Sequence, residues 1–229
     1  MMLREFCAEN MTDVPAAIAA GAARIELCDN LAVGGTTPGY GVIRAAVAFA
    51  HARNAQVMVM ARPRGGSFEY DDREARMILD GIALIRRLGA DGAVFGCLIR
   101  DGATGELTVD RGLVRRAVQA AKGPLPDPEG STPLIQLTFH MAFDVLTEER
   151  QREAIDVLAG YGVDRILTHG GDAATPIEGN LGKLSGLVDY ADGRIAIMPG
   201  GGITYRNAEA VSRTLGVNEV HGTNIVSIS

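Results

Sequence analysis

The chain has 229 residues, of which 47% are hydrophobic and 22% are charged, a composition typical of a globular protein with a sizeable core. Its formal net charge is −6, and it lacks a basic stripe, so we expect neither nucleic-acid binding nor attachment to a membrane surface. The N-terminal segment does not read as a secretory signal, and the three cysteines show no short-range pairing pattern, so we expect a cytoplasmic protein with reduced thiols.

Eight short apolar segments alternate with seven helical patterns along the chain, and several follow a glycine that can end a helix. We predict strands at Leu3–Glu9, Arg24–Cys28, Gln56–Arg62, Ala93–Ile99, Leu134–Met141, Arg165–His169, Arg194–Met198 and Glu219–Thr223. This alternation predicts a TIM-type (βα)8 barrel that occupies residues 1–229 as a single domain. The alternative fold is a doubly wound sheet. That fold typically has a Gly-rich turn after its first strand, and the segment at this place, CAENMTD, contains no glycine.

The end of the chain and one connection qualify this prediction. Six residues follow the last predicted strand, so the eighth helix would be short or missing, and a partner chain could cover the gap. We therefore expect a homodimer or a higher homo-oligomer. The Pro- and Gly-rich stretch 122–133 precedes the fifth predicted strand, and we interpret it as a loop on the side of the barrel away from active sites.

Inward-facing side chains follow from the alternation of a barrel strand. In the second predicted strand, Ile25 and Leu27 would face the helices and leave Glu26 and Cys28 inside. The same reasoning gathers at the C-terminal barrel mouth, where barrel active sites lie, the residues Glu5, Cys7, Glu26, Cys28, Arg62, His140, His169 and His221. Two ordinary alternatives stay open: the charged residues could form a buried ion-pair network, and the cysteines could be small buried apolar groups.

Three loops carry further signals. Arg62 and Arg64 flank a proline before two glycines, and their guanidinium groups could clamp an anion, unless the acidic residues that follow tie the loop down. Gly200, Gly201 and Gly202 follow the seventh predicted strand, where many barrels hold a phosphate, although they could simply form a tight turn. Asp144 stands four residues after His140 and could orient its imidazole.

The motifs RIELCDNLAVGGTTP, RPRGGSF, TFHMAFD, RILTHGG, MPGGGIT and EVHG occur in this order, and together they resemble the CutC family of copper homeostasis proteins over essentially the whole chain. The resemblance implies a TIM barrel, a cytosolic location, copper binding and assembly into dimers or larger oligomers. Carried over by motif, the mouth residues would be Glu5, Glu26, Cys28, Arg62, Arg64, His140, Asp144 and His221. Met141 stands where many members of the family have arginine.

Two functions remain open at this stage. In the first, Cys7 and Cys28 on neighbouring strands bind Cu(I), which prefers soft sulfur donors, and Met198 could add a thioether. In the second, the same mouth is an isomerase, lyase or hydrolase active site for a small anionic or phosphorylated substrate. Glu26 or His140 would move a proton and Asp144 would tune the histidine, while the anion would be held by Glu5, Arg62, Arg64, Gly200, Gly201, Gly202, His169 and His221.

Overall fold

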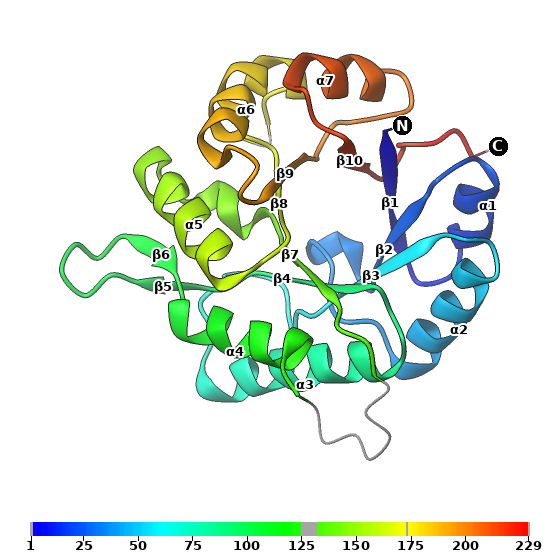
Figure 1. The fold of residues 1–229 in the computed structure, drawn as a ribbon, viewed down its shortest axis with the longest axis horizontal. Coiled ribbons are helices and arrows are strands. Elements are labelled where there is room, and N and C mark those ends of the chain that lie inside the picture. Colours follow the sequence, from blue (N-terminus) through cyan, green and yellow to red (C-terminus); the bar gives the residue numbers. More distant parts are fainter. Residues whose placement is uncertain (1, 125–131, 173, 229) are drawn as a thin grey trace.

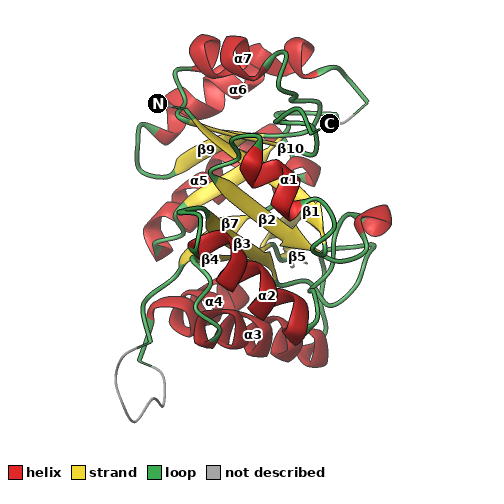
Figure 2. Cartoon of the chain, turned by 90° about the vertical axis from the view of Figure 1, so that its right-hand side faces the viewer, coloured by secondary structure: helices red, strands yellow, loops and turns green. Residues whose placement is uncertain are grey.

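The computed structural model describes residues 2–124, 132–172 and 174–228, so most of the predicted loop 122–133 lies outside the described residues. Eight parallel strands curl into a nearly closed barrel, and helices surround it (Figures 1 and 2). The hydrogen-bonded order is β10-β1-β2-β3-β4-β7-β8-β9, which leaves β9 beside β10. The barrel strands are β1 (Leu3–Glu9), β2 (Arg24–Cys28), β3 (Gln56–Met60), β4 (Gly92–Phe95), β7 (Gln136–Phe139), β8 (Arg165–Thr168), β9 (Ala196–Pro199) and β10 (Glu219–Gly222). The TIM-type barrel predicted from the sequence is confirmed.

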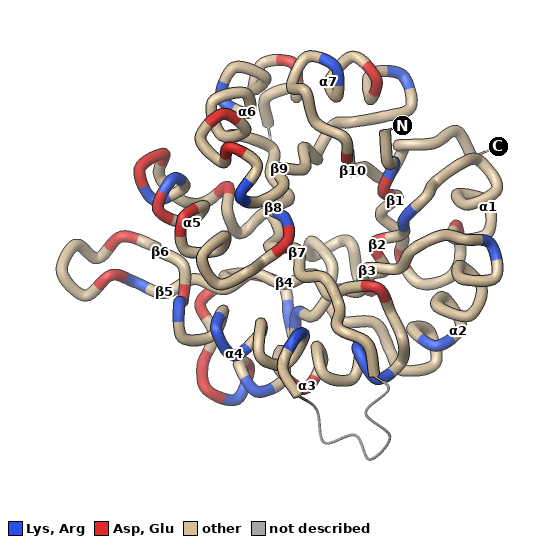
Figure 3. The backbone as a smooth tube through the Cα atoms, viewed as in Figure 1, with Lys and Arg blue, Asp and Glu red and all other residues tan. Residues whose placement is uncertain are grey.

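Seven α-helices cover the barrel in the described part of the chain. They are α1 (Val14–Ala19), α2 (Tyr40–His51), α3 (Asp72–Arg87), α4 (Arg111–Lys122), α5 (Glu148–Tyr161), α6 (Ile177–Ala191) and α7 (Ala208–Leu215). The sequence explains α3 locally, because Asp71 and Glu74 form a capping box at its start and the buried Ile78, Ile82 and Ile85 recur at helical spacing. Figure 3 shows acidic and basic residues interspersed around this outer ring.

The alternation predicted for the strands is present. Ile25 and Leu27 belong to the large apolar layer between strands and helices, whereas Cys28 belongs to a small cluster inside the barrel. That interior cluster consists of Cys7, Cys28, Met58, Met60 and Val94. A polar network fills the other half of the interior, near the strand starts, where Arg24 pairs with Glu5 and with Glu219 and where Arg165 also pairs with Glu219.

Several predicted strand bounds were wrong at their ends. The strand predicted at Ala93–Ile99 ends at Phe95, and Leu98 begins a separate antiparallel hairpin, β5 (Leu98–Arg100) with β6 (Leu107–Val109), which projects from the barrel (Figure 1). The break falls at Gly96, where a Cβ atom would lie only 2.3 Å from the His140 ring. β3 ends at Met60, so Arg62 stands just beyond its strand. β7 ends before His140, and Met141 begins a short 3-10 helix, η2 (Met141–Val145).

The described residues after β10, 223–228, contain no α-helix, as predicted. Ile225 and Val226 are nevertheless buried, so this tail packs its own apolar side chains against the protein. The predicted homo-oligomer stays a prediction. None of the described helices is long and apolar enough to cross a membrane.

Candidate functional site

A cavity of about 320 Å³ lies at the C-terminal ends of the barrel strands. This is the end of the barrel at which the sequence placed the site, and the size suits a small molecule. It is lined by Cys7, Glu26, Cys28, Leu31, Val33, Gly34, Met60, Arg62, Phe68, His140, Met141, Leu167 and His221. Six residues predicted for the mouth therefore do meet in one place: Cys7, Glu26, Cys28, Arg62, His140 and His221.

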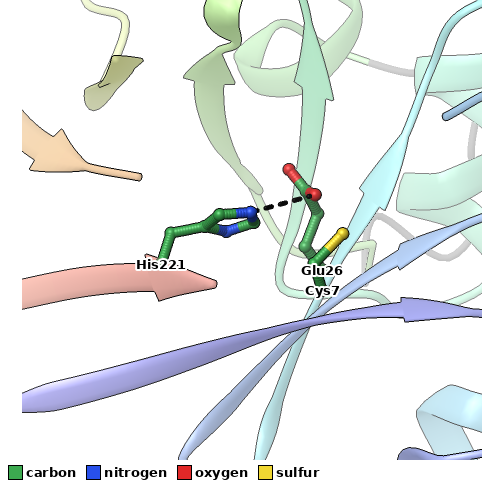
Figure 4. Close-up of side chains that lie close together, drawn as sticks. All are labelled: Cys7, Glu26 and His221. Carbon is green, nitrogen blue, oxygen red and sulfur yellow. Dashed lines mark ion pairs between the residues drawn. The ribbon is translucent and has the colours of Figure 1, made fainter. Parts of the chain in front are cut away.

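One side of the cavity, which we call the sulfur side, is formed by Cys7, Glu26, Cys28 and His221 from β1, β2 and β10. A ligand atom from each of Cys7, Glu26 and His221 lies within 4.8 Å of the other two (Figure 4). His221 Nε2 is 3.7 Å from Glu26 Oε2, and Cys28 Sγ is 3.7 Å from the same oxygen. These side chains converge because neighbouring parallel strands place Cys7 level with Glu26 in the ladder.

Burial and mutual contacts shift the protonation of the sulfur side. The hydrogen bond from the Cys28 thiol, together with His221, holds the pKa of the Cys7 thiol well below its usual value. Complete burial raises the pKa of Glu26 well above its usual value. Burial would by itself lower the pKa of His221, but the neighbouring carboxyl groups and Cys7 raise it well above normal. Cys7 is thus the thiol that most readily becomes a thiolate, the form that binds metals.

Glu5 lies beneath the cavity and contacts it through His221. Its Oε1 is 2.8 Å from His221 Nδ1, and its other oxygen accepts a hydrogen bond from Arg24. Burial opposes ionisation, but the Arg24 guanidinium lowers the pKa of Glu5 to about 2. The ion-pair alternative therefore describes Glu5 well: it is a buried carboxylate that orients His221.

The glycine-rich loop after β2 closes over the sulfur side. A Cβ atom on Gly35 would lie 3.1 Å from Cys28 Sγ and 3.5 Å from the terminal methyl group of Met60, and Gly35 has a φ of +84°. Only glycine combines this close approach with this backbone conformation at little cost. The loop can therefore rest directly on the sulfur atoms that it covers.

The other side of the cavity, which we call the donor side, is formed by Arg62, Phe68 and His140. The Arg62 guanidinium and the His140 ring each lie 5.0 Å from the centre of the Phe68 ring. Both terminal nitrogens of Arg62 donate hydrogen bonds to backbone carbonyl groups. Nη1 donates to the carbonyls of residues 33, 34 and 35, and Nη2 donates to that of Gly66. Its fork therefore holds two loops together, and its Nε–H is left over.

His140 is held as a neutral ring with a defined tautomer. Its Nδ1 accepts a hydrogen bond from the backbone N–H of Ala142 over 3.1 Å, so the ring proton lies on Nε2. Burial, followed by the charge of Arg62, lowers the pKa of His140 to about 3. The ring is 5% exposed.

Three buried polar atoms around the cavity have no hydrogen-bond partner among the described residues. They are Glu26 Oε1, Arg62 Nε and His140 Nε2. Buried polar groups are usually satisfied, and leaving one unsatisfied costs about 1–3 kcal/mol. Their gathering at one cavity points to a polar ligand.

The remaining predicted residues lie outside the cavity. Arg64 pairs with Glu74 over 2.5 Å, beside its own loop. Asp144 accepts hydrogen bonds from Thr168 Oγ1 and from the backbone N–H of His169, and within the described part of the chain its carboxylate forms no hydrogen bond with His140. His169 in turn places both ring nitrogens against backbone carbonyls.

The glycine loop after β9 is occupied by contacts within the chain. The carbonyl oxygens of Gly200 and Gly201 face His169 Nδ1 at 3.1 Å, and the N–H of Gly200 donates to Thr168. Gly202 accepts a hydrogen bond from Asn207. Met198, which could have supplied a thioether, contacts Arg24 at 3.2 Å in the polar network below the cavity.

Sequence reasoning missed Phe68, Met60, Leu31 and Leu167. The alternation of β3 contained a signal for Met60, because it shares its parity with the inward-facing Met58. Phe68 stands in a loop and Leu31 in a short 3-10 helix, where strand alternation gives no orientation, so only the folded chain reveals their place.

Comparisons with known proteins agree over nearly the whole chain. The model of the CutC family matches residues 2–226. A CutC family protein of Enterococcus faecalis is 51% identical over 98% of this chain and 100% of its own length. The human copper homeostasis protein cutC homolog is 38% identical over 96% of this chain and 72% of its own length.

Solved structures give the same result. The crystal structure of CutC from Streptococcus agalactiae superposes with a TM-score of 0.88 at 42% identity, covering 99% of this chain and 100% of the other. An aldolase at 13% identity, with a TM-score of 0.66 over 99% of this chain and 91% of its own, shares the fold alone. The family model, these relatives and the shared fold agree: the chain belongs to the CutC family.

Proposed function

We propose that the sulfur side of the cavity binds Cu(I). The observation that supports this is the contact between the Cys7 and Cys28 thiols in a cavity that also exposes the Met60 thioether. Cu(I) prefers soft thiolate and thioether ligands, and the lowered pKa of Cys7 favours the thiolate form of this ligand. The human and mouse relatives, named copper homeostasis proteins, point in the same direction.

The test is an anaerobic Cu(I) competition titration of the reduced protein against a chromogenic chelator. We expect one tight site per chain, and loss of that site in the Cys7→Ala/Cys28→Ala variant. Cys97→Ala is the matched control, because Cys97 is equally buried but contacts the carbonyl of Asp110 away from the cavity. Tight binding that survives in the double variant would refute the thiolate site.

A second candidate function is acid–base catalysis on a small anionic substrate in the same cavity. It is favoured by Glu26, a cavity-lining carboxyl group with a raised pKa, one oxygen without a hydrogen-bond partner among the described residues and His221 beside it. Such a group can take and return a proton. Because Asp144 bonds elsewhere, the role of tuning His140 that the sequence gave it is not part of this proposal.

Proton transfer can be tested without knowing the overall reaction. We would follow deuterium incorporation from D2O into small oxo acids and sugar phosphates by NMR, with Glu26→Gln as the variant. Catalysed exchange that Glu26→Gln removes would support the enzyme. Absence of exchange across the panel, or exchange that Glu26→Gln retains, would count against it.

A further inference from the structure

We propose that the donor side of the cavity is a binding site for a short-chain monocarboxylate, whose carboxylate group accepts hydrogen bonds from Arg62 Nε–H and His140 Nε2–H. If the second candidate function is correct, this carboxylate is its substrate class, and in that respect the inference rests on the proposed function. The binding itself depends neither on catalysis nor on copper.

The first argument is the lack of a counter-ion for Arg62. Its side chain is 4% exposed, and the carbonyl groups that it contacts carry no net charge. Among the described residues, no carboxylate forms an ion pair with it. A buried charge is costly unless it is paired, so an anionic ligand would remove an existing penalty.

The second argument is the pair of free donors. Among the described residues, Arg62 Nε and His140 Nε2 are both buried without a hydrogen-bond partner, and both groups contact the ring of Phe68. The Tyr70 hydroxyl, which is also buried and unpartnered there, lies near Arg62 and is the neighbouring group that would compete with a ligand for it. His140 cannot turn its proton elsewhere, because its Nδ1 is held by Ala142 N–H. Each group thus offers one fixed N–H, which suits the two oxygens of a carboxylate.

The third argument separates carboxylate from phosphate. A phosphate group is usually held by several backbone N–H groups or by a complete guanidinium fork. Here the two terminal nitrogens of Arg62 already donate to loop carbonyl groups, and the N–H of Gly200 already donates to the carbonyl of Thr168. Two single donors fit a smaller, singly charged group.

The fourth argument concerns the rest of the ligand. The remaining wall of the cavity is apolar and comes from Leu31, Val33, Met60, Met141 and Leu167. The cavity volume of about 320 Å³ is at the lower end for small-molecule sites. The occupant would therefore be a carboxylate with a short apolar chain.

The experiment is calorimetric titration of the metal-free, reduced protein with acetate, butanoate, hexanoate and octanoate, beside hexanamide and inorganic phosphate. We expect at least one acid to bind one-to-one with a dissociation constant below about 1 mM, and at least about tenfold weaker binding of hexanamide and phosphate. The absence of binding by all four acids would overturn the proposal, as would equal binding of the amide or of phosphate.

Variants locate the site. His140→Met removes the donor while keeping an apolar side chain, and we expect about tenfold weaker binding of the acid. His140→Gln keeps an N–H donor and should retain binding within about threefold. Arg73→Met, which removes a positive charge from the exposed start of α3, is the control for general electrostatics.

The outcomes separate this proposal from the functions above. Binding that is unchanged in His140→Met would overturn the donor site. Binding of the acid without any catalysed deuterium exchange would support the carboxylate site and refute the proposed acid–base catalysis. The Cu(I) titration of His140→Met should match that of the unmodified protein, because the sulfur side lacks His140.

Discussion

At the scale of single residues, the cavity combines polar groups in unusual protonation states. His140 is a neutral imidazole buried beside the cation Arg62, and Cys7 is a thiol poised to ionise. Neither state follows from the residue type, because burial and a neighbouring charge decide it. Such clusters are frequent at functional sites, which supports placing the function here.

The low pKa of His140 leads to a prediction for stability. The folded protein keeps this ring neutral down to a pH of about 3, whereas in the unfolded chain it protonates near its ordinary pKa of 6.5. His140 therefore contributes stability above pH 6.5, and that contribution is lost as the pH falls toward 3, at about 1.4 kcal/mol per pH unit. We expect His140→Gln to lose stability less steeply across this window.

The measurement is chemical denaturation of both proteins at several pH values within the window. His51→Gln controls for the loss of a histidine, because His51 lies at the exposed end of α2. Parallel stability curves for His140→Gln and the unmodified protein would contradict the prediction.

At the scale of elements, Arg62 organises the entrance to the site. The single side chain that follows β3 joins the short 3-10 helix η1 (Leu31–Val33), with the glycines after it, to the loop that contains Gly66. Two loops from different βα units are thereby held in one arrangement over the sulfur side. The sequence predicted that the guanidinium fork of Arg62 would bind an anion, whereas in the structure the fork binds backbone carbonyl groups of two loops.

Arg62→Lys should loosen this entrance. Lysine keeps the charge but cannot reach several carbonyls with a planar fork, so we expect a loss of about 2 kcal/mol in the free energy of unfolding. Amide hydrogen exchange of residues 31–35 should become faster, because their local opening no longer breaks these bonds. Hydrogen-exchange mass spectrometry measures this. Arg100→Lys, on the exposed β5–β6 hairpin, is the control, and unchanged exchange at 31–35 would refute the role.

At the scale of the whole molecule, the polar network below the cavity ties together the two ends of the strand order. Glu219 on β10 pairs with Arg24 on β2 at 2.5 Å and with Arg165 on β8 at 2.8 Å. Both arginines are almost completely buried. The network therefore spans the barrel near the place where β9 and β10 meet.

Glu219→Gln should destabilise the barrel by about 3 kcal/mol, because it leaves the buried Arg165 guanidinium without its carboxylate partner and Arg24 with Glu5 alone. Denaturant titration at neutral pH measures the change. Glu209→Gln is the matched control: Glu209 also pairs with an arginine, Arg4, but its side chain is 70% exposed, and such pairs contribute little. Equal effects of the two substitutions would show that the network does not support barrel closure.

The sequence by itself determined the architecture and, where apolar and polar residues alternate, the faces of a strand. Ile25 and Leu27 alternate with Glu26 and Cys28, and a pleated strand must place such sets on opposite sides. Strand and helix patterns recur eight and seven times, which suffices for the barrel. The end of the fourth strand was missed, because periodicity alone does not show that Gly96 packs against the ring of His140, which lies far along the chain.

Only the tertiary structure decided which of the candidate residues share a cavity and what each one contacts. Asp144 and His140 are four residues apart, yet Asp144 bonds to Thr168 and His169 from the neighbouring β8 segment. His169 likewise places its Nδ1 against the carbonyl oxygens of Gly200 and Gly201. The physical reason is that a hydrogen bond forms only where the fold brings a donor and an acceptor within about 3 Å of each other. The spacing of two residues along the chain does not fix that distance.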